Sequence, residues 1–121
     1  MGRDVAKPQG RQSAASDLTI RPAFNSDGDA IGALIAGVFA EYPGCVYDRA
    51  REFPELDAIA DDFKASDGRI WVAVDPDNRV FGCFGIKYDA PAKEAELHKV
   101  YLHRDTRGRG MAQKLMAKAL A

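Results

Sequence analysis

The chain of 121 residues is 46% hydrophobic and 29% charged, which suits one globular domain with a hydrophobic core. Its net charge of −1 gives no reason to expect nucleic acid as a partner, and residues 1–17 contain no apolar run that would predict a signal peptide or a membrane span. Two cysteines, Cys45 and Cys83, without a secretory signal predict reduced thiols and a cytoplasmic protein rather than a disulfide framework.

The first third of the chain predicts a tail, a strand and a helix. Residues 1–17 are polar and rich in small side chains, so we expect a disordered N-terminal tail, followed by a single domain over residues 18–121. Residues 18–24 alternate between apolar and polar side chains, which predicts a strand. After a turn at residues 25–28, apolar side chains recur with the spacing of one helical face, at Ile31, Leu34, Ile35, Val38 and Phe39.

The rest of the chain predicts a second helix, three strands and a last helix. Pro54 suits the first turn of a helix that ends at residues 66–68. Residues 69–74 and 79–86 predict an antiparallel hairpin, and residues 94–102 predict a further strand. The order β-α-α-β-β-β-α indicates an α/β protein of the α+β kind. The last helix has an apolar face made of Ala112, Leu115, Met116, Ala119 and Leu120.

Positive charge gathers at the C-terminal end of the sequence. Residues 99–121 contain six cations and one acid, Asp105, a net charge of +5, so the remainder sums to −6. A basic end on a slightly acidic protein favours a small polyanionic ligand over a long one. The six cations are Lys99, Arg104, Arg107, Arg109, Lys114 and Lys118.

Two glycines and two arginines, Arg107-Gly108-Arg109-Gly110, stand where the predicted strand at 94–102 gives way to the last helix. A helix start offers backbone N–H groups without intrahelical partners and a partial positive charge. Glycines let these N–H groups converge on one anion, and arginines add charge-assisted hydrogen bonds to phosphate. The junction therefore predicts a pyrophosphate site, which we call the cradle (residues 107–112). The alternative is a flexible surface turn that is basic.

The sequence Arg107-x-x-Gly110-x-Ala112 resembles the acetyl-CoA signature of the GNAT family of N-acetyltransferases, Gln/Arg-x-x-Gly-x-Gly/Ala. The order of elements also resembles the first part of that fold, in which helices flank a mixed, mainly antiparallel sheet. The resemblance covers residues 18–121 and implies acetyl-CoA as the co-substrate, with no metal. It also implies that the strand backbone holds the pantetheine arm and the cradle holds the pyrophosphate, through Val100, Tyr101, Leu102, Arg107, Gly108, Arg109, Gly110, Met111 and Ala112.

Two side chains on the strand before the cradle are candidates for the chemistry. Acetyl transfer to an amine needs the neutral amine, so a base has to remove a proton. Glu96 and His98 are two residues apart and therefore point to the same face of the strand. Glu96 stands four residues before Val100, which resembles the offset of the glutamate base in histone-modifying members of the family, and His98 is its partner or rival. The alternatives are a solvated or cross-strand-paired glutamate and a structural histidine.

The acceptor implied by the resemblance is an amine-bearing small molecule or an amine of a peptide or protein. Cys45 and Cys83 are expected to pack as small residues rather than to act as nucleophiles. A set of acids between residues 52 and 67 favours a solvated helix face, with an acidic wall for a cationic amine as the alternative. These acids are Glu52, Glu55, Asp57, Asp61, Asp62 and Asp67.

The family fold continues with a β-α-β-β part beyond the last helix predicted here, and that part commonly supplies a tyrosine as the general acid. We therefore expect a C-terminally truncated domain in which the strand at 94–102 lies at an open edge of the sheet. Two functions fit. The first is an acetyl-CoA-dependent N-acetyltransferase that works by direct attack in a ternary complex. The second is a non-catalytic acyl-CoA-binding or interaction module, with a homo-oligomer or another chain completing the sheet.

Overall fold

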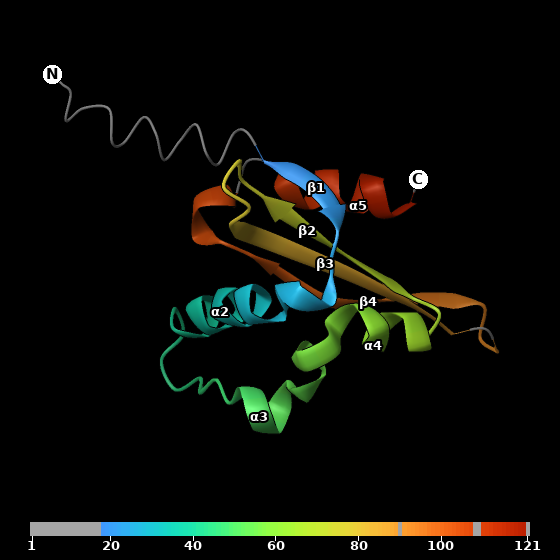
Figure 1. The fold of residues 1–121 in the computed structure, drawn as a ribbon, viewed down its shortest axis with the longest axis horizontal. Coiled ribbons are helices and arrows are strands. Elements are labelled where there is room, and N and C mark those ends of the chain that lie inside the picture. The colour runs from blue at the N-terminus through green and yellow to red at the C-terminus, as the bar shows by residue number, and fades with distance from the viewer. Residues whose placement is uncertain (1–17, 90, 108–109, 121) are drawn as a thin grey trace, which may run out of the picture.

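The computed structural model describes residues 18–89, 91–107 and 110–120, and its centre is one antiparallel sheet of four strands (Figure 1). The strands lie in the order β1-β2-β3-β4, and each pairs with the next along the chain. The predicted hairpin and the strand that follows it are confirmed, whereas the predicted tail at 1–17 lies outside the described residues. The bounds are Thr19–Pro22 for β1, Arg69–Val74 for β2, Val80–Asp89 for β3 and Glu94–Leu102 for β4.

Strand β2 is buried on both faces, as its unbroken apolar sequence indicates. Side chains alternate between the two faces of a strand, so β2 contributes to two separate cores. Ile70, Val72 and Val74 pack in the first core, and Trp71 and Ala73 pack in the second. The sheet therefore lies between two hydrophobic layers.

Helices α2 (Gly28–Phe39), α3 (Arg49–Glu52) and α4 (Ile59–Ala65) lie on one side of the sheet (Figure 1). The predicted apolar face of α2 is confirmed, since Ile31 and Ile35 are fully buried in the first core. Helix α4 adds Ile59 and Phe63 to the same core. The first core thus joins the α2–α4 layer to β2 and β3.

The second predicted helix is divided in the structure. A 3-10 helix, η2 (Pro54–Ala58), begins at Pro54 as the sequence indicated, and α4 follows it. Ala58 has φ −148° and ψ 61°, which lies outside the helical region and separates the two pieces. The Asn25 side-chain oxygen accepts the backbone N–H groups of Ala60 and Asp61 at 2.9 and 3.1 Å. A cap supplied from elsewhere in the chain therefore starts α4 at a position that local sequence does not reveal.

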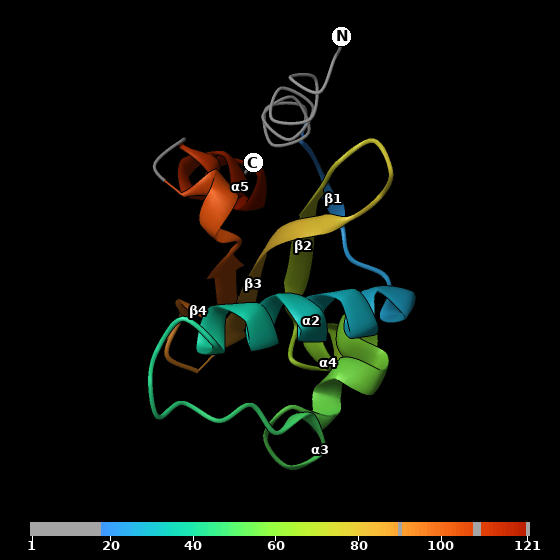
Figure 2. The ribbon, with the colours of Figure 1, turned by 90° about the vertical axis from the view of Figure 1, so that its left-hand side faces the viewer.

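Helix α5 (Met111–Leu120) lies on the opposite side of the sheet, as two perpendicular views show (Figures 1 and 2). Met111 and Leu115 are buried in the second core. Met116, predicted to belong to the apolar face, is 42% exposed. Successive residues of a helix are about 100° apart around its axis, so the neighbour of Leu115 turns away from the sheet. No helix in the described part of the chain is both long and apolar enough to cross a membrane.

Candidate active site

The cradle lies between the end of β4 and the start of α5. A short 3-10 helix, η3 (Arg104–Thr106), follows β4, and the buried Thr106 hydroxyl donates to the His103 carbonyl at 2.8 Å. Gly110 has φ +75°, a left-handed conformation that residues with a Cβ rarely adopt. Its carbonyl accepts the N–H of Lys114 at 3.1 Å and so begins α5. Gly110 therefore turns the chain into the helix at the position that the sequence motif requires.

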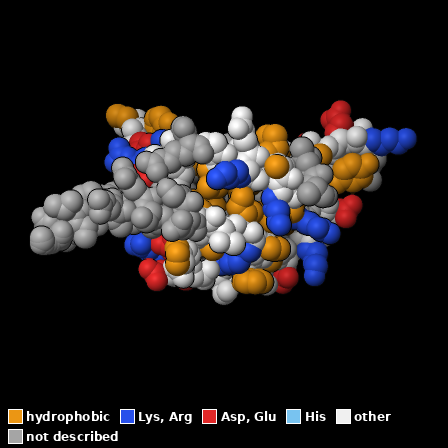
Figure 3. All heavy atoms as spheres, turned by 90° about the horizontal axis from the view of Figure 1, so that it is seen from above, with side chains coloured by type: hydrophobic (Ala, Val, Ile, Leu, Met, Phe, Trp, Pro, Cys, Tyr) orange, Lys and Arg blue, Asp and Glu red, His pale blue; other side chains and the backbone are white. Residues whose placement is uncertain are grey.

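The first turn of α5 forms the end of the cradle, and side chains of the helix anchor it on the sheet. Met111 and Leu115 hold it on the sheet, and its first N–H groups have no acceptors within the helix. Lys and Arg side chains lie over the middle of the face that α5 covers, while Asp and Glu side chains lie at its rim (Figure 3). Gly108, Arg109 and the side chain of Ala112 lie outside the described residues. Helix starts and basic side chains are features that anion-binding sites commonly share.

Strand β4 is the last strand of the sheet, so one side of its backbone has no strand partner within the described chain. Val100 is 42% exposed, Tyr101 packs against Phe39 in the first core, and Leu102 packs in the second core. Two of these three side chains are thus occupied by packing. What this edge offers to an extended ligand is its backbone N–H and C=O groups.

A β-bulge interrupts β4 beside these residues. Cys83 stands opposite Tyr101 but Gly85 stands opposite His98, so two residues of β4 oppose one residue of β3. Lys99, within the bulge, has φ +55°. Its carbonyl accepts the Cys83 thiol at 3.0 Å, and burial raises the pKa of that thiol to about 12. The bulge re-aims the β4 backbone, and the thiol is a buried packing group rather than a nucleophile.

The Lys99 side chain ties this bulge to the α2–α4 layer. Its Nζ lies 2.5 Å from a carboxylate oxygen of Glu55 and 5.5 Å from the centroid of the Phe53 ring. The Phe53 ring in turn stacks on Tyr47, with 5.6 Å between the ring centroids. An alternating strand pattern contains no signal for a left-handed lysine, so the sequence does not reveal this role of Lys99.

Arg107, predicted to meet the pyrophosphate, has partners within the protein. Its Nη1 and Nη2 atoms lie 2.6 and 2.8 Å from the two carboxylate oxygens of Glu41, which follows α2. Its Nε and Nη2 also donate to the Leu102 carbonyl, at 3.2 and 3.0 Å. The hydrogen bonds from Arg107 lower the pKa of Glu41, so this carboxylate is ionised at neutral pH. Nothing in the sequence pattern singles out Glu41, which is 66 residues away from Arg107.

Glu96 and His98 are brought together as the strand spacing predicts. The Nε2 atom of His98 lies 3.2 Å from a carboxylate oxygen of Glu96, and the His98 ring meets the Phe63 ring edge-on at 6.4 Å. Both residues line an open hollow of about 470 Å³ between the end of α4 and the β3–β4 hairpin. Asp67 and Asp89 line the same hollow. The pair therefore faces solvent-accessible space that a small molecule or side chain can enter.

Three of the six acids between residues 52 and 67 form ion pairs, and Asp61 accepts a hydrogen bond from Asn25, which supports the solvated helix face. Ion pairs join Asp57 to Arg49 at 3.0 Å and Asp62 to Lys87 at 3.2 Å. Within residues 18–89, 91–107 and 110–120, no group of three His, Cys, Asp or Glu side chains is placed to hold a metal ion.

Comparison with known proteins places this geometry in a family. Residues 25–121 match the model of the acetyltransferase (GNAT) family, and the chain belongs to that family. A GNAT-family acetyltransferase from Staphylococcus aureus Mu50 is similar in structure, with a TM-score of 0.72 at 20% identity. An acetyltransferase from Streptococcus agalactiae 2603 gives 0.71 at 18% identity, and the F149G mutant of the spermidine N-acetyltransferase SpeG from Vibrio cholerae gives 0.57 at 21%. The predicted fold class and family resemblance are thereby confirmed.

The chain is shorter than these structural relatives. The matches cover 85%, 86% and 87% of this chain but only 63%, 64% and 61% of the S. aureus, S. agalactiae and V. cholerae chains, respectively. At these identities the likeness concerns the fold. No curated protein matches the sequence.

Proposed function

We propose that the chain is the cofactor-binding portion of an acetyl-CoA-dependent N-acetyltransferase that transfers an acetyl group to an amine by direct attack in a ternary complex. The observation that carries the proposal is Gly110, left-handed at φ +75°, at the start of the helix that comes after the edge strand β4 and the short η3 turn. This arrangement supports a pyrophosphate at the first turn of α5 and an extended pantetheine arm along the β4 backbone. Acetyl-CoA, a metal-free reaction and a cytoplasmic setting belong to the same proposal.

In this proposal the bulge in β4 is where the thioester lies, and Glu96 and His98 serve the amine. A strand rises about 3.3 Å per residue, so Glu96 lies roughly 10 Å along β4 from Lys99, while His98 is its neighbour. Glu96 therefore accepts the ammonium proton of the acceptor through His98 or a water molecule rather than at the thioester itself. The neutral amine attacks the thioester carbonyl carbon and the C–N bond forms. As the C–S bond breaks, the nitrogen loses its surplus proton to solvent, and the CoA thiolate leaves and takes up a proton from solvent.

Acetyl-CoA turnover with a panel of small amines, amino acids and lysine peptides tests the proposal. Glu96→Gln keeps the shape of the side chain and removes the base, so kcat should fall about 10²- to 10⁴-fold while acetyl-CoA binding persists. The loss should shrink at high pH, where more of the amine is already neutral. Glu94→Gln is a matched control, because it makes the same change on the same face of β4, at the exposed end of the strand. Parental turnover in Glu96→Gln together with loss of turnover in His98→Ala would move the base to His98.

A second candidate is an acyl-CoA-binding or interaction module without turnover. The observation that favours it is the uncovered edge of β4, where Leu97 is 57% and Val100 is 42% exposed. A second copy or another chain that adds a strand to this edge would cover both side chains. CoA binding by calorimetry without turnover of any amine supports this candidate, and measurable turnover by the 121-residue chain excludes it.

A further inference from the structure

The contacts of Arg107 give this arginine a role different from that of a phosphate ligand. A guanidinium has five N–H donors. Four of them are engaged within the described chain, two on the carboxylate of Glu41 and two on the carbonyl of Leu102. One Nη1 hydrogen remains for a ligand. A bidentate contact to phosphate, the arrangement that makes arginine a strong phosphate ligand, would require at least one of these bonds to break.

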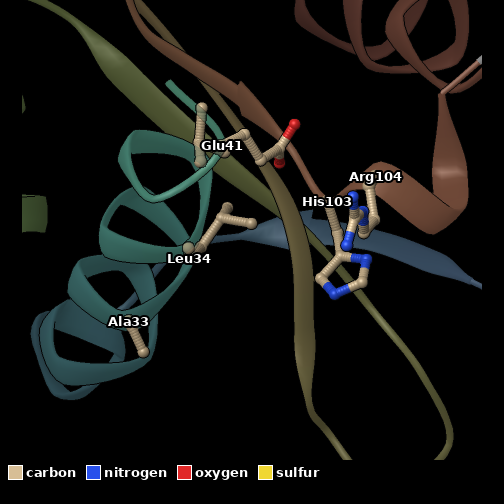
Figure 4. Close-up of a pocket in the computed structure, with 7 residues that line it drawn as sticks. Ala33, Leu34, Glu41, His103 and Arg104 are labelled. Atoms are coloured by element: carbon tan, nitrogen blue, oxygen red, sulfur yellow. The ribbon is translucent and has the colours of Figure 1, made fainter. Parts of the chain in front are cut away.

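Glu41 is an unusual partner for this position in the fold. It follows the C-terminal end of α2, where the helix dipole disfavours an acid. Its carboxylate is directed across the end of β4, and Glu41 lines a hollow of about 290 Å³ with His103 and Arg104 (Figure 4). Hydrogen bonds from Arg107 and the charges of Arg104 and His103 lower the pKa of Glu41. An acid surrounded by basic groups at a helix C-terminus is stabilised by those groups, above all by Arg107.

The two hydrogen-bond acceptors of the Arg107 guanidinium belong to elements that lie far apart in the sequence. Glu41 belongs to the layer of α2, and Leu102 is the last residue of β4, immediately before the turn into the cradle. The guanidinium thus connects the end of α2 to the end of β4 through four hydrogen bonds. Four hydrogen bonds restrain the Arg107 side chain and, through it, the Arg107 backbone. Arg107 is the first residue of the cradle, so these bonds restrain the start of the cradle.

We propose that Arg107 and Glu41 form a clamp that positions the entrance of the cradle, so that CoA affinity depends on the pair rather than on contact between the Arg107 charge and phosphate. This inference rests on the proposed function. It makes a prediction opposite in sign to simple electrostatics. Removing a negative charge beside an anion site should raise affinity for the anion, whereas removing one half of a clamp should lower it.

Calorimetric titration of CoA into the parent chain, four variants of the pair and one control variant tests the clamp. Glu41→Gln and Arg107→Gln should each weaken binding about threefold to tenfold. The double variant should bind no more weakly than the worse single variant, because the second change removes a contact that is already lost. Exchanging the two charges, with Glu41→Arg and Arg107→Glu together, should recover much of the affinity. Glu52→Gln on α3, an exposed acid away from Arg107, is the control and should leave the affinity unchanged.

The outcomes separate the clamp from the alternatives. Unchanged or tighter CoA binding by Glu41→Gln overturns the clamp. The clamp is also overturned if Arg107→Gln lowers CoA affinity by the same factor in the Glu41→Gln background as in the parent chain. Failure of the parent chain to bind CoA refutes the proposed function instead. In that case a double-mutant cycle on thermal unfolding decides the structural half of the inference. Coupling between positions 41 and 107 supports a clamp, and additive effects overturn it.

Discussion

Gly110→Ala isolates the backbone conformation at the cradle from every steric effect. Within the described residues, a Cβ placed on Gly110 meets the side-chain oxygen of Gln113 at 3.8 Å, which is an ordinary contact distance. The penalty therefore comes from φ +75° alone. A residue with a Cβ in the left-handed region loses roughly 1–2 kcal/mol. Alanine recovers about 0.4–1 kcal/mol of this by restricting the unfolded chain.

The net expectation is a loss of about 1 kcal/mol in the free energy of unfolding, or about 3–5 °C in Tm for a domain of this size. Gly37→Ala is the matched control, since Gly37 lies within α2 and a Cβ there meets no described atom outside its own helix backbone within 4 Å. That change should instead stabilise the protein by about 0.5–1 kcal/mol. The same chemical substitution should thus have opposite signs at the two positions.

Thermal unfolding followed by circular dichroism measures both variants, and calorimetry with CoA measures the consequence for the cradle. Gly110→Asn should lose less stability than Gly110→Ala, because asparagine tolerates the left-handed region. Gly110→Val should lose the most and should bind CoA least well. Equal stabilisation by alanine at positions 110 and 37, with no loss of CoA affinity, would refute the left-handed turn and the cradle built on it.

Three further changes have defined outcomes. We predict that Arg109 contacts the adenosine 3′-phosphate of CoA. CoA should then bind more tightly than dephospho-CoA, by a difference that shrinks with added salt, and equal affinities would rule out this contact. Gly85→Ala places a Cβ 2.3 Å from the Phe63 ring, so calorimetric unfolding should show a loss of about 3 kcal/mol, and a neutral result would contradict the packing. Asp27 accepts two hydrogen bonds from the Arg21 side chain and one from the backbone N–H of Phe24. Burial is the strongest influence and raises the pKa of the Asp27 carboxyl, but the hydrogen bonds and the Arg21 charge together outweigh it, so the pKa is lowered. Asp27→Asn should therefore cost about 2 kcal/mol near pH 7 by chemical unfolding. The gap to the parent should begin to close as the pH falls below about 4, where the carboxyl becomes protonated in the unfolded chain, and should be lost as the pH falls through the lower pKa of the folded protein.

The sequence predicted the elements whose signal is local and left undetermined the contacts that depend on distant residues. The apolar periodicity of Ile31 and Ile35 places α2, and the unbroken apolar run of β2 places the strand that is buried on both faces. The division of the second helix depends on Asn25, which caps α4 from another part of the chain. No local pattern contains that information.

The candidate site divides in the same way. The sequence identifies Gly110 because the motif requires glycine at this position. It identifies Glu96 and His98 because a spacing of two residues places both on one face of a strand. Lys99 and Glu41 were not identified. Lys99 is left-handed because the pairing of β4 with β3 shifts register at this point. Glu41 matters through its contact with Arg107, and only folding brings these two residues together.

Lys99 and Gly110 are left-handed residues at the two ends of the segment that would hold the cofactor, at φ +55° and +75°. Between them, Tyr101 and Leu102 place their side chains in the two cores, so the surface left to a ligand is largely backbone. A site made of backbone groups restricts only those residues that set the backbone conformation. It follows that most side-chain changes in this segment should alter stability before they alter CoA recognition, whereas changes at Gly110 and in the clamp should affect CoA recognition directly.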